Sequence, residues 1–301
     1  MDLQKLATSS FGVKTVITIV RLLPPKFAIA LGSLIANQIS KRINSPMIRS
    51  IRSNQWVIRG RALSKGELLE ATREVLQHQA RCFFDLYRTI RYPEEIKELS
   101  PASADSEVLI QLSQSRKDGA MIVAPHLSNF DLVLLSHAYR GFQGQLLTYG
   151  EPTSGYEIQN ELRASTGLDI TPVRGEITHQ EAIERMRNGG LVATAVDRPI
   201  RKKKRVINFF GLPSHLPTGH IRMALTADVP VLVAAAQYRS DGKYHLLLSD
   251  PILMQRHPDP TIEIKMNAEA VLNVIASFIL QNPEQWLMYY PVWPDILEEV
   301  P

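Results

Sequence analysis

Apolar residues follow two different spacings along the chain. Between 67 and 91 they recur near every 3.6 residues up to Pro93, which predicts an amphipathic helix. Beyond that point, short apolar runs alternate with helix-like segments. The runs are AMIVAP, LLTYG, LDITPV, LVATAVD, VPVLVAAAQY and YHLLLSD, and the helix-like segments lie around 130–140, 156–166, 178–188, 219–227 and 268–281. This alternation predicts an α/β fold with a mixed, mostly parallel central sheet flanked by helices.

The predicted elements form one continuous folding unit. The 301 residues contain no internal repeat, low-complexity tract or long linker, and 45% hydrophobic residues supply a sizeable core. We expect a helical, basic, membrane-associating region over 1–100, followed by an α/β domain over 101–301.

Positive charge is concentrated at the start of the chain. Residues 1–61 contain ten Lys or Arg against one acid, Asp2. The longest uncharged run there, 27–40, has 14 residues, fewer than the roughly 20 that a membrane span needs, and no signal-peptide cleavage site follows it. Helices that mix basic and large apolar residues suit an anionic membrane surface. The alternative is a basic helical layer packed on the main domain.

Several kinds of chemistry are disfavoured by missing motifs. Cys82 is the only cysteine, so neither a disulfide framework nor a cysteine-rich metal site is possible, and it is expected to be buried. His215 and His220 lack the H-E-x-x-H pattern, so we expect no metal. The sequence has no G-x-S-x-G, G-x-G-x-x-G or P-loop pattern.

A histidine and an aspartate flank the junction between a predicted strand and helix. AMIVAP ends just before His126, and the helix-like run begins at Asp131, so HLSN forms the turn at the carboxyl end of the strand, where α/β sheets bind ligands. His126 could act as a general base, oriented by Asp131 in the first helical turn. The structural alternative is a capping box from Ser128 to Asp131 with an ordinary loop histidine. A base without a protein nucleophile implies attack by a substrate hydroxyl.

Five segments follow one another in a recognisable order. They are GAMIVAPHLSNFDL, YEIQNELRASTGLDITPV with Arg163 and Gly167, GGLVATAVDRP with Asp197 and Arg198, VINFFGLPSHLPTGHIRMALTADVPVL, and PEQWLMYYPVW. Together they resemble the bacterial lipid A biosynthesis acyltransferase family, the lauroyl and myristoyl transferases within the wider glycerolipid acyltransferase group. The resemblance covers about 15–295.

The resemblance implies a glycerolipid acyltransferase-like fold and transfer of an acyl group from a thioester on acyl carrier protein or coenzyme A to a hydroxyl of a membrane lipid, with no other cofactor. His126 would be the base and Asp131 its partner. Arg163, Asp197 and Arg198 would bind substrate. Their structural alternatives are a helix-end salt bridge for Arg163 and a strand-end organising role for Asp197. The implied location is the cytoplasmic face of the bacterial inner membrane, and the competing function is a catalytically silent lipid-binding protein.

The chain departs from the family pattern at the catalytic motif. Where the family usually has H-x-G-N-W-E, this sequence has Ser128, Phe130 and Asp131 in place of Gly, Trp and Glu. Arg198 stands where the family has glutamine. These departures leave the acceptor open between a glycolipid and a phospholipid.

Two further features concern anionic ligands. A basic run, Arg201, Lys202, Lys203, Lys204 and Arg205, precedes two phenylalanines, a combination that favours contact with phosphate or a membrane. A solvated loop and a nucleic-acid contact are the alternatives, although no nucleic-acid module is recognisable and we expect no such partner. Gly219 lies in LPTG before a helix whose free amides could hold a phosphate or an oxyanion, and ordinary turn use of glycine is the alternative.

Overall fold

The computed structural model describes residues 15, 18, 20, 24–151, 154–200 and 205–301. Within that part, the secondary structure before residue 100 is entirely helical. The helices from Pro25 onward are α3 (Pro25–Ser40), α4 (Pro46–Ile58), α5 (Lys65–Thr89) and α6 (Pro93–Leu99), and α7 (Ala104–Ser115) follows them. The division of the chain near residue 100 stays a prediction.

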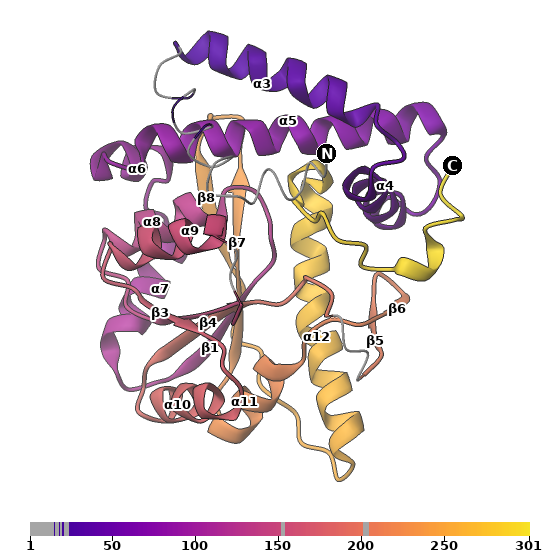
Figure 1. Ribbon diagram of the computed structural model, residues 1–301. Helices are drawn as coiled ribbons and strands as arrows, with labels where there is room; N and C mark the ends of the chain where they lie inside the picture. The colour runs from indigo at the N-terminus through magenta and orange to yellow at the C-terminus, as the bar shows by residue number, and fades with distance from the viewer. Residues whose placement is uncertain (1–14, 16–17, 19, 21–23, 152–153, 201–204) are drawn as a thin grey trace.

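Helix α5 is the long amphipathic helix that the sequence pattern predicts. It begins with a capping box in which the side chains of Ser64 and Glu67 each accept a hydrogen bond from the other's backbone N–H. Its apolar stripe, with Leu68 and Val75, is buried against the rest of the molecule. Helix α3 lies along the outer side of α5, so two helices form one edge of the molecule (Figure 1).

A six-stranded sheet forms the centre of the fold. Its strands are β1 (Ala120–Ala124), β2 (Gln145–Thr148), β3 (Asp169–Pro172), β4 (Leu191–Ala195), β7 (Val231–Tyr238) and β8 (Tyr244–Leu248). Their spatial order is β3-β2-β4-β1-β7-β8, and every neighbouring pair is parallel except β7 with β8. The predicted mixed, mostly parallel sheet is therefore confirmed.

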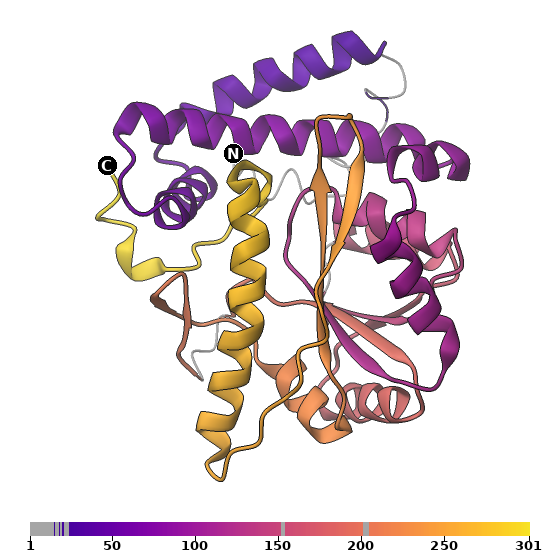
Figure 2. The same ribbon diagram turned by 180° about the vertical axis from the view of Figure 1, so that it is seen from behind.

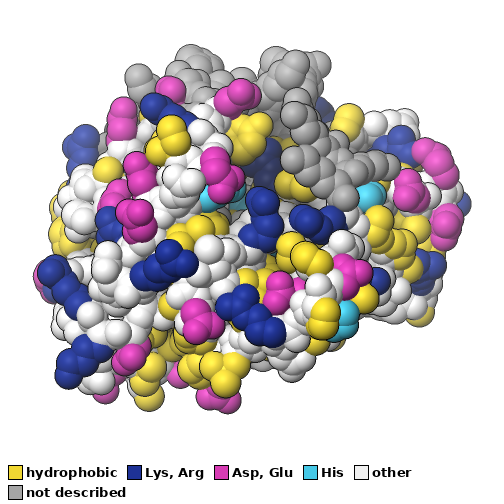
Figure 3. Space-filling view, turned by 90° about the horizontal axis from the view of Figure 1, so that it is seen from below, with side chains coloured by type: hydrophobic (Ala, Val, Ile, Leu, Met, Phe, Trp, Pro, Cys, Tyr) yellow, Lys and Arg dark blue, Asp and Glu magenta, His cyan; other side chains and the backbone are white. Residues whose placement is uncertain are grey.

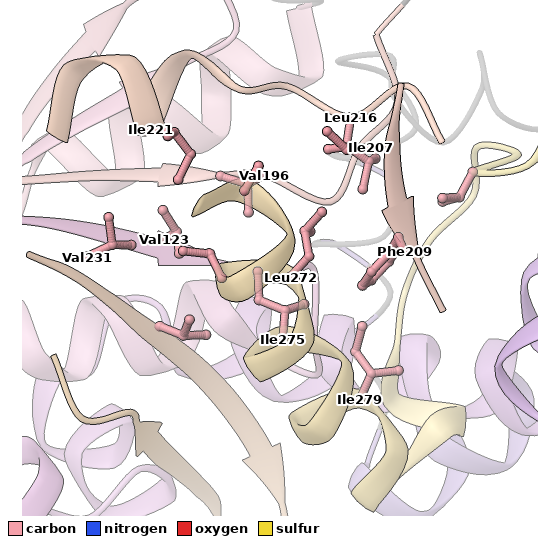
Figure 4. Packing of buried hydrophobic residues seen from close by; sticks show 14 of the residues in the cluster. Val123, Val196, Ile207, Phe209, Leu216, Ile221, Val231, Leu272, Ile275 and Ile279 are labelled. Atoms are coloured by element: carbon pink, nitrogen blue, oxygen red, sulfur yellow. The ribbon is translucent and has the colours of Figure 1, made fainter. Parts of the chain in front are cut away.

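Helices cover both faces of this sheet. They are α8 (Phe130–Ala138), α9 (Ser154–Ala164), α10 (Glu176–Arg187), α11 (Gly219–Ala227) and α12 (Pro260–Gln281). Alternate residues of β1 enter two cores, because neighbouring side chains of a strand point to opposite faces. Met121 and Val123 pack in the core with α11 and α12, part of which Figure 4 shows, while Ile122 packs in the core with α5 and α8.

The remaining elements connect distant parts of the chain. The β7–β8 hairpin reaches α5, as Figure 2 shows, and the Tyr244 hydroxyl donates a 2.6 Å hydrogen bond to Asp85 of that helix. A separate hairpin pairs β5 (Ile207–Phe209) with β6 (Leu212–Ser214). After α12, two short 3-10 turns, η1 (Pro283–Gln285) and η2 (Pro294–Ile296), bring the C-terminus beside α4 (Figure 1).

No helix among the described residues combines the length and apolar character needed to cross a bilayer.

Candidate active site

The site lies where two neighbouring parallel strands end. Ala124 of β1 and Ala195 of β4 are paired in register, and the Val196 N–H extends the ladder by donating to the Ala124 carbonyl. His126 and Asp197 each come two residues after these last paired positions. Because parallel strands finish at the same edge of a sheet, the two side chains emerge next to each other.

His126 and Asp197 make a direct and short contact. The His126 Nδ1 lies 2.6 Å from Asp197 Oδ1, and the backbone N–H of His126 donates to Asp197 Oδ2 at 2.8 Å. The aspartate side chain is fully buried, whereas 21% of the histidine side chain is exposed. With Nδ1–H donating to the carboxylate, the lone pair of the neutral ring is on Nε2, the nitrogen that a base uses.

The carboxylate of Asp197 is held ionised. Burial raises the pKa of Asp197, but attraction to a protonated His126 and the hydrogen bonds from His126 and Trp286 more than offset burial, so this pKa lies below its usual value. The Trp286 Nε1–H supplies one of these bonds, at 2.8 Å from Oδ2. The carboxylate is therefore a fixed negative charge beside the imidazole.

Asp131 does not hold the position that the sequence analysis expected. The carboxylate on His126 Nδ1 belongs to Asp197. Asp131 instead accepts a 2.7 Å hydrogen bond from Nε of Arg163, and Nη2 of Arg163 lies 2.7 Å from the same oxygen. Neighbouring strands, rather than proximity in sequence, decide which acid meets the histidine. Asp131 lies in the first turn of α8 and bonds across to α9.

The start of α8 also differs from the capping-box alternative. Asn129 is the N-cap and its side-chain oxygen accepts from the Leu132 N–H, while its Nδ2 donates to the Cys82 carbonyl of α5. Ser128 has a φ of 51°, the left-handed region that favours glycine, which is the family residue at this place. Its hydroxyl lies 2.9 Å from His78 Nε2. The turn 126–129 is thus anchored to α5.

Arg163 is buried in the last turn of α9. Besides its ion pair with Asp131, its Nη1 donates to Asn160 at 2.9 Å. The ion pair therefore joins α9 to α8. Breaking such a buried pair by removing one partner costs about 3–5 kcal/mol, so Arg163 has a structural role whatever its contact with substrate.

Arg198 is packed between aromatic rings directly after Asp197. Its guanidinium carbon lies 3.9 Å from the ring centre of Tyr290 and 5.6 Å from that of Tyr149, and its Nη1 donates to the Tyr156 hydroxyl at 3.3 Å. Stacking restrains the guanidinium plane, and a restrained guanidinium suits recognition of carboxylate or phosphate.

Gly219 and Arg205 come together at a hollow of about 460 Å³. The residues that line it are Ile200, Arg205, Leu216, Pro217, Thr218, Gly219 and Arg222. Gly219 begins α11, and the Thr218 side chain does not cap that helix. Two arginines therefore lie at the uncapped helix start where an anion was predicted, and the binding of an anion there stays a prediction. The predicted contact residues Arg201, Lys202, Lys203 and Lys204 lie outside the described residues.

Among the described residues, no cluster of three or more His, Cys, Asp or Glu side chains could hold a metal ion.

Two residues of this site, Asp197 and Trp286, were not predicted in their observed positions. Asp197 was expected to bind substrate or, as the alternative, to organise the pocket at the strand end. The signal for its pairing with His126 was the equal offset of both residues from the ends of two apolar runs. Trp286 was noted only within the PEQW segment. No spacing along the chain relates position 286 to position 197.

Comparison with known proteins identifies relatives over most of the chain. The family model described as bacterial lipid A biosynthesis acyltransferase matches residues 3–294. Two phosphatidylinositol mannoside acyltransferases of Mycobacterium tuberculosis, from strains CDC 1551 / Oshkosh and ATCC 25618 / H37Rv, are 25% and 26% identical over 186 residues. These matches cover 60% of this chain and 56% of each relative, so the chain spans little more than half their length.

A solved structure also aligns with the chain. It is the 1-acyl-sn-glycerophosphate acyltransferase PlsC from Thermotoga maritima, with 14% identity, a TM-score of 0.38, and coverage of 83% of this chain and 97% of that one. The fold assignment stands on the strand order and pairing described above. The family match extends over nearly the whole sequence and confirms the resemblance in the motifs. The chain belongs to the bacterial lipid A biosynthesis acyltransferase family, whose acyltransferases act on lipids.

Proposed function

We propose that this protein is an O-acyltransferase that moves a fatty acyl group from an acyl thioester to a hydroxyl of a membrane glycolipid or phospholipid. The observation that carries the proposal is the His126–Asp197 pair at the carboxyl edge of the sheet. A partly exposed imidazole on a buried, ionised carboxylate is the arrangement of a general base. The thioester donor would be carried by acyl carrier protein or coenzyme A.

In the proposed reaction, His126 Nε2 takes the proton of the acceptor hydroxyl while the oxygen attacks the thioester carbonyl. A C–O bond forms and the C–S bond breaks, and the departing thiolate takes the proton from the imidazolium. Asp197 fixes the tautomer and stabilises the imidazolium without accepting its proton. The chain's own side chains then form no acyl intermediate.

The arginines support binding of a phosphorylated substrate. Arg198 follows Asp197 in the sequence and is restrained by Tyr290, and Arg205 and Arg222 line the hollow with Gly219. We propose that these groups contact phosphate on the acceptor lipid or on the donor carrier. The two relatives are named for phosphatidylinositol mannosides, which supports an acceptor that combines a phospholipid with sugar hydroxyls. Arg163 is paired with Asp131 instead.

The outer face of α3 supports a peripheral position on a membrane. Phe27, Leu31, Leu34 and Ile35 recur at helical spacing on that face, and 68% of Phe27 and 57% of Leu34 are exposed. Exposed basic residues lie at both ends of this stripe, Lys26 at the beginning and Lys41 and Arg42 after the end. By contrast, the opposite face of the molecule mixes basic, acidic and hydrophobic side chains (Figure 3).

We therefore propose that α3 lies on an anionic bilayer, on the cytoplasmic side, with its apolar stripe among the lipid headgroups. An amphipathic helix of this kind binds through buried apolar area together with attraction between basic residues and anionic lipid. The predicted phosphate or membrane contact of the basic run that ends at Arg205 is a separate one, because Arg205 lines the hollow at α11, which lies at the opposite end of the molecule from α3 (Figure 1).

Release of free thiol tests the enzymatic function. The purified protein is incubated with acyl-coenzyme A or acyl carrier protein thioester and a membrane lipid extract. We expect lipid-dependent thiol release by the wild type and by His257→Ala, a histidine far from the proposed chemistry along the chain, and none by His126→Ala. Equal lipid-dependent release by all three proteins would reject His126 as the base. Release by none of them would favour a catalytically silent lipid-binding protein.

A further inference from the structure

The segment after α12 runs along the turn 126–129, which contains the proposed base. The Leu287 N–H donates to the His126 carbonyl at 2.8 Å, and the Ser128 N–H donates to the Gln285 carbonyl at 2.7 Å. Between these two bonds, Leu127 and Trp286 form an isolated antiparallel bridge. The backbone on either side of the base is therefore paired with the C-terminal segment.

The same segment is tied to two other elements. The Gln285 side chain accepts from the Tyr238 N–H and donates to the Tyr238 carbonyl, both at 2.8 Å, which joins it to the end of β7. From α4, Asn54 Nδ2 donates to the carbonyls of Met288 and Tyr290 at 3.1 and 2.9 Å. These bonds fix the position from which Trp286 reaches the active site.

The indole of Trp286 is immobilised by packing. It is 1% exposed, and its ring centre lies 6.1 Å from that of Phe209, 6.4 Å from Phe210 and 6.3 Å from Trp293. Its N–H lies at hydrogen-bond distance from Asp197 Oδ2. A donor fixed in this way can hold the carboxylate without moving during the reaction.

We propose that Trp286 is a positioning residue for the base: its N–H orients Asp197 and limits how strongly this carboxylate attracts the proton of His126. The inference rests on the proposed role of His126. A hydrogen bond to Oδ2 withdraws negative charge from the carboxylate, and its loss would leave the carboxylate more attractive to the imidazolium. The base would then stay protonated to higher pH.

The elements around the site carry other charged or titratable groups. Those joined to one another or to the turn that follows β1 are Arg198 after β4, Asp131 of α8, Arg163 and Tyr156 of α9, His78 of α5, Tyr238 of β7, and Tyr289 and Tyr290 of the C-terminal segment. Replacement of the indole by a phenyl ring changes the charge of none of them. A change in the pH dependence of the variant would therefore report the lost N–H.

Trp286→Phe and Trp293→Phe form a matched test. Trp293 is 2% exposed in the same aromatic cluster, but its Nε1 has no hydrogen-bond partner among the described residues. The measurement is the pH profile of kcat/KM for thiol release. In Trp286→Phe the acid limb should move up by about half to one pH unit, a three- to tenfold change in proton affinity, and Trp293→Phe should keep the wild-type profile.

A second readout needs no substrate. NMR titration of the histidine rings, with His126 assigned through His126→Ala, should show the same upward movement in Trp286→Phe. Benzothienylalanine at position 286 keeps the two-ring shape and removes the N–H, so it should give this result even if the phenyl variant folds poorly. An unmoved His126 titration, or equal movement in Trp293→Phe, overturns the inference. A moved titration in a protein that never turns over substrate supports the inference and rejects the proposed function.

Discussion

Replacing Asp197 by asparagine perturbs the site at one atom. Asp197 Oδ2 accepts two hydrogen bonds, from the His126 backbone N–H and from Trp286, and Oδ1 faces Nδ1 of His126. The single amide oxygen of asparagine can serve the two donors only if its NH₂ group turns toward Nδ1. Two donors cannot face each other, so the imidazole must carry its proton on Nε2 instead.

The magnitude of the effect follows from this change of tautomer. An imidazole protonated on Nε2 presents no lone pair to the acceptor hydroxyl, and loss of the correct tautomer in a histidine-based site lowers kcat by about 10⁴-fold. The reverse orientation of the amide would keep the tautomer, but it leaves two buried N–H groups facing an NH₂ group. Each buried N–H without an acceptor destabilises the folded protein by about 1–3 kcal/mol. We therefore expect kcat to fall by about 10³–10⁴-fold in Asp197→Asn.

Asp131→Asn is the matched control, because the structure pairs Asp131 with Arg163. This variant weakens a buried ion pair, so we expect the free energy of unfolding in urea to fall by about 3 kcal/mol while the His126 tautomer stays unchanged. The assays are kcat for thiol release and the ¹⁵N shifts of the His126 ring. The reasoning is refuted if Asp197→Asn keeps kcat within tenfold of wild type, or if Asp131→Asn is the variant that switches the tautomer.

Three further predictions concern stability and membrane binding. Burial lowers the pKa of His78 to about 4 and that of His220 to about 3, so these histidines take up protons in the unfolded chain before they do so in the folded protein as the pH falls. The free energy of unfolding should therefore drop between about pH 6.5 and 4. In urea titrations at several pH values, His78→Gln should show a smaller drop over this range. Gly119→Ala should lower the melting temperature sharply, because the new Cβ would lie 1.8 Å from the Met186 carbonyl oxygen; a melting curve like that of the wild type would contradict this packing. Leu34→Glu on α3 should weaken cosedimentation with anionic liposomes and leave the melting temperature unchanged, and undiminished binding would exclude this face as the contact.

The architecture was largely predictable because each element has its own local signal. The apolar run at 120–124 became a strand buried on both faces, and the helical period before Pro93 became α5 with a capping box at its start. Both signals arise from periods of about 2 and 3.6 residues that short segments already display. The predicted sheet and family are accordingly confirmed.

The pairing of His126 with Asp197 was less predictable, because it depends on which strands are neighbours. His126 and Asp197 are 71 residues apart, and only the pairing of β1 with β4 brings them together. Asp131 is close in sequence, but its bond to Arg163 depends on how α8 packs against α9. Sequence spacing within a turn could not choose between the two acids.

The contribution of the C-terminal segment depends on still longer connections. Asn54 and Val292 are hydrogen-bonded across 238 residues, and Trp286 and Asp197 across 89. Such contacts do not change the spacing of apolar and polar residues in the sequence, because a single polar group has no pattern that identifies its partner. The predicted roles of Gly219, Arg198 and the basic run in binding substrate stay predictions.

Mass spectrometry of the lipid product tests the central claim most directly. The protein is incubated with an isotope-labelled acyl thioester and a membrane lipid extract, and the lipids are analysed for the added acyl mass. The proposed function predicts one labelled acyl group on a lipid hydroxyl with the wild type and none with His126→Ala. Labelled lipid in equal amount from both proteins would contradict a base at His126.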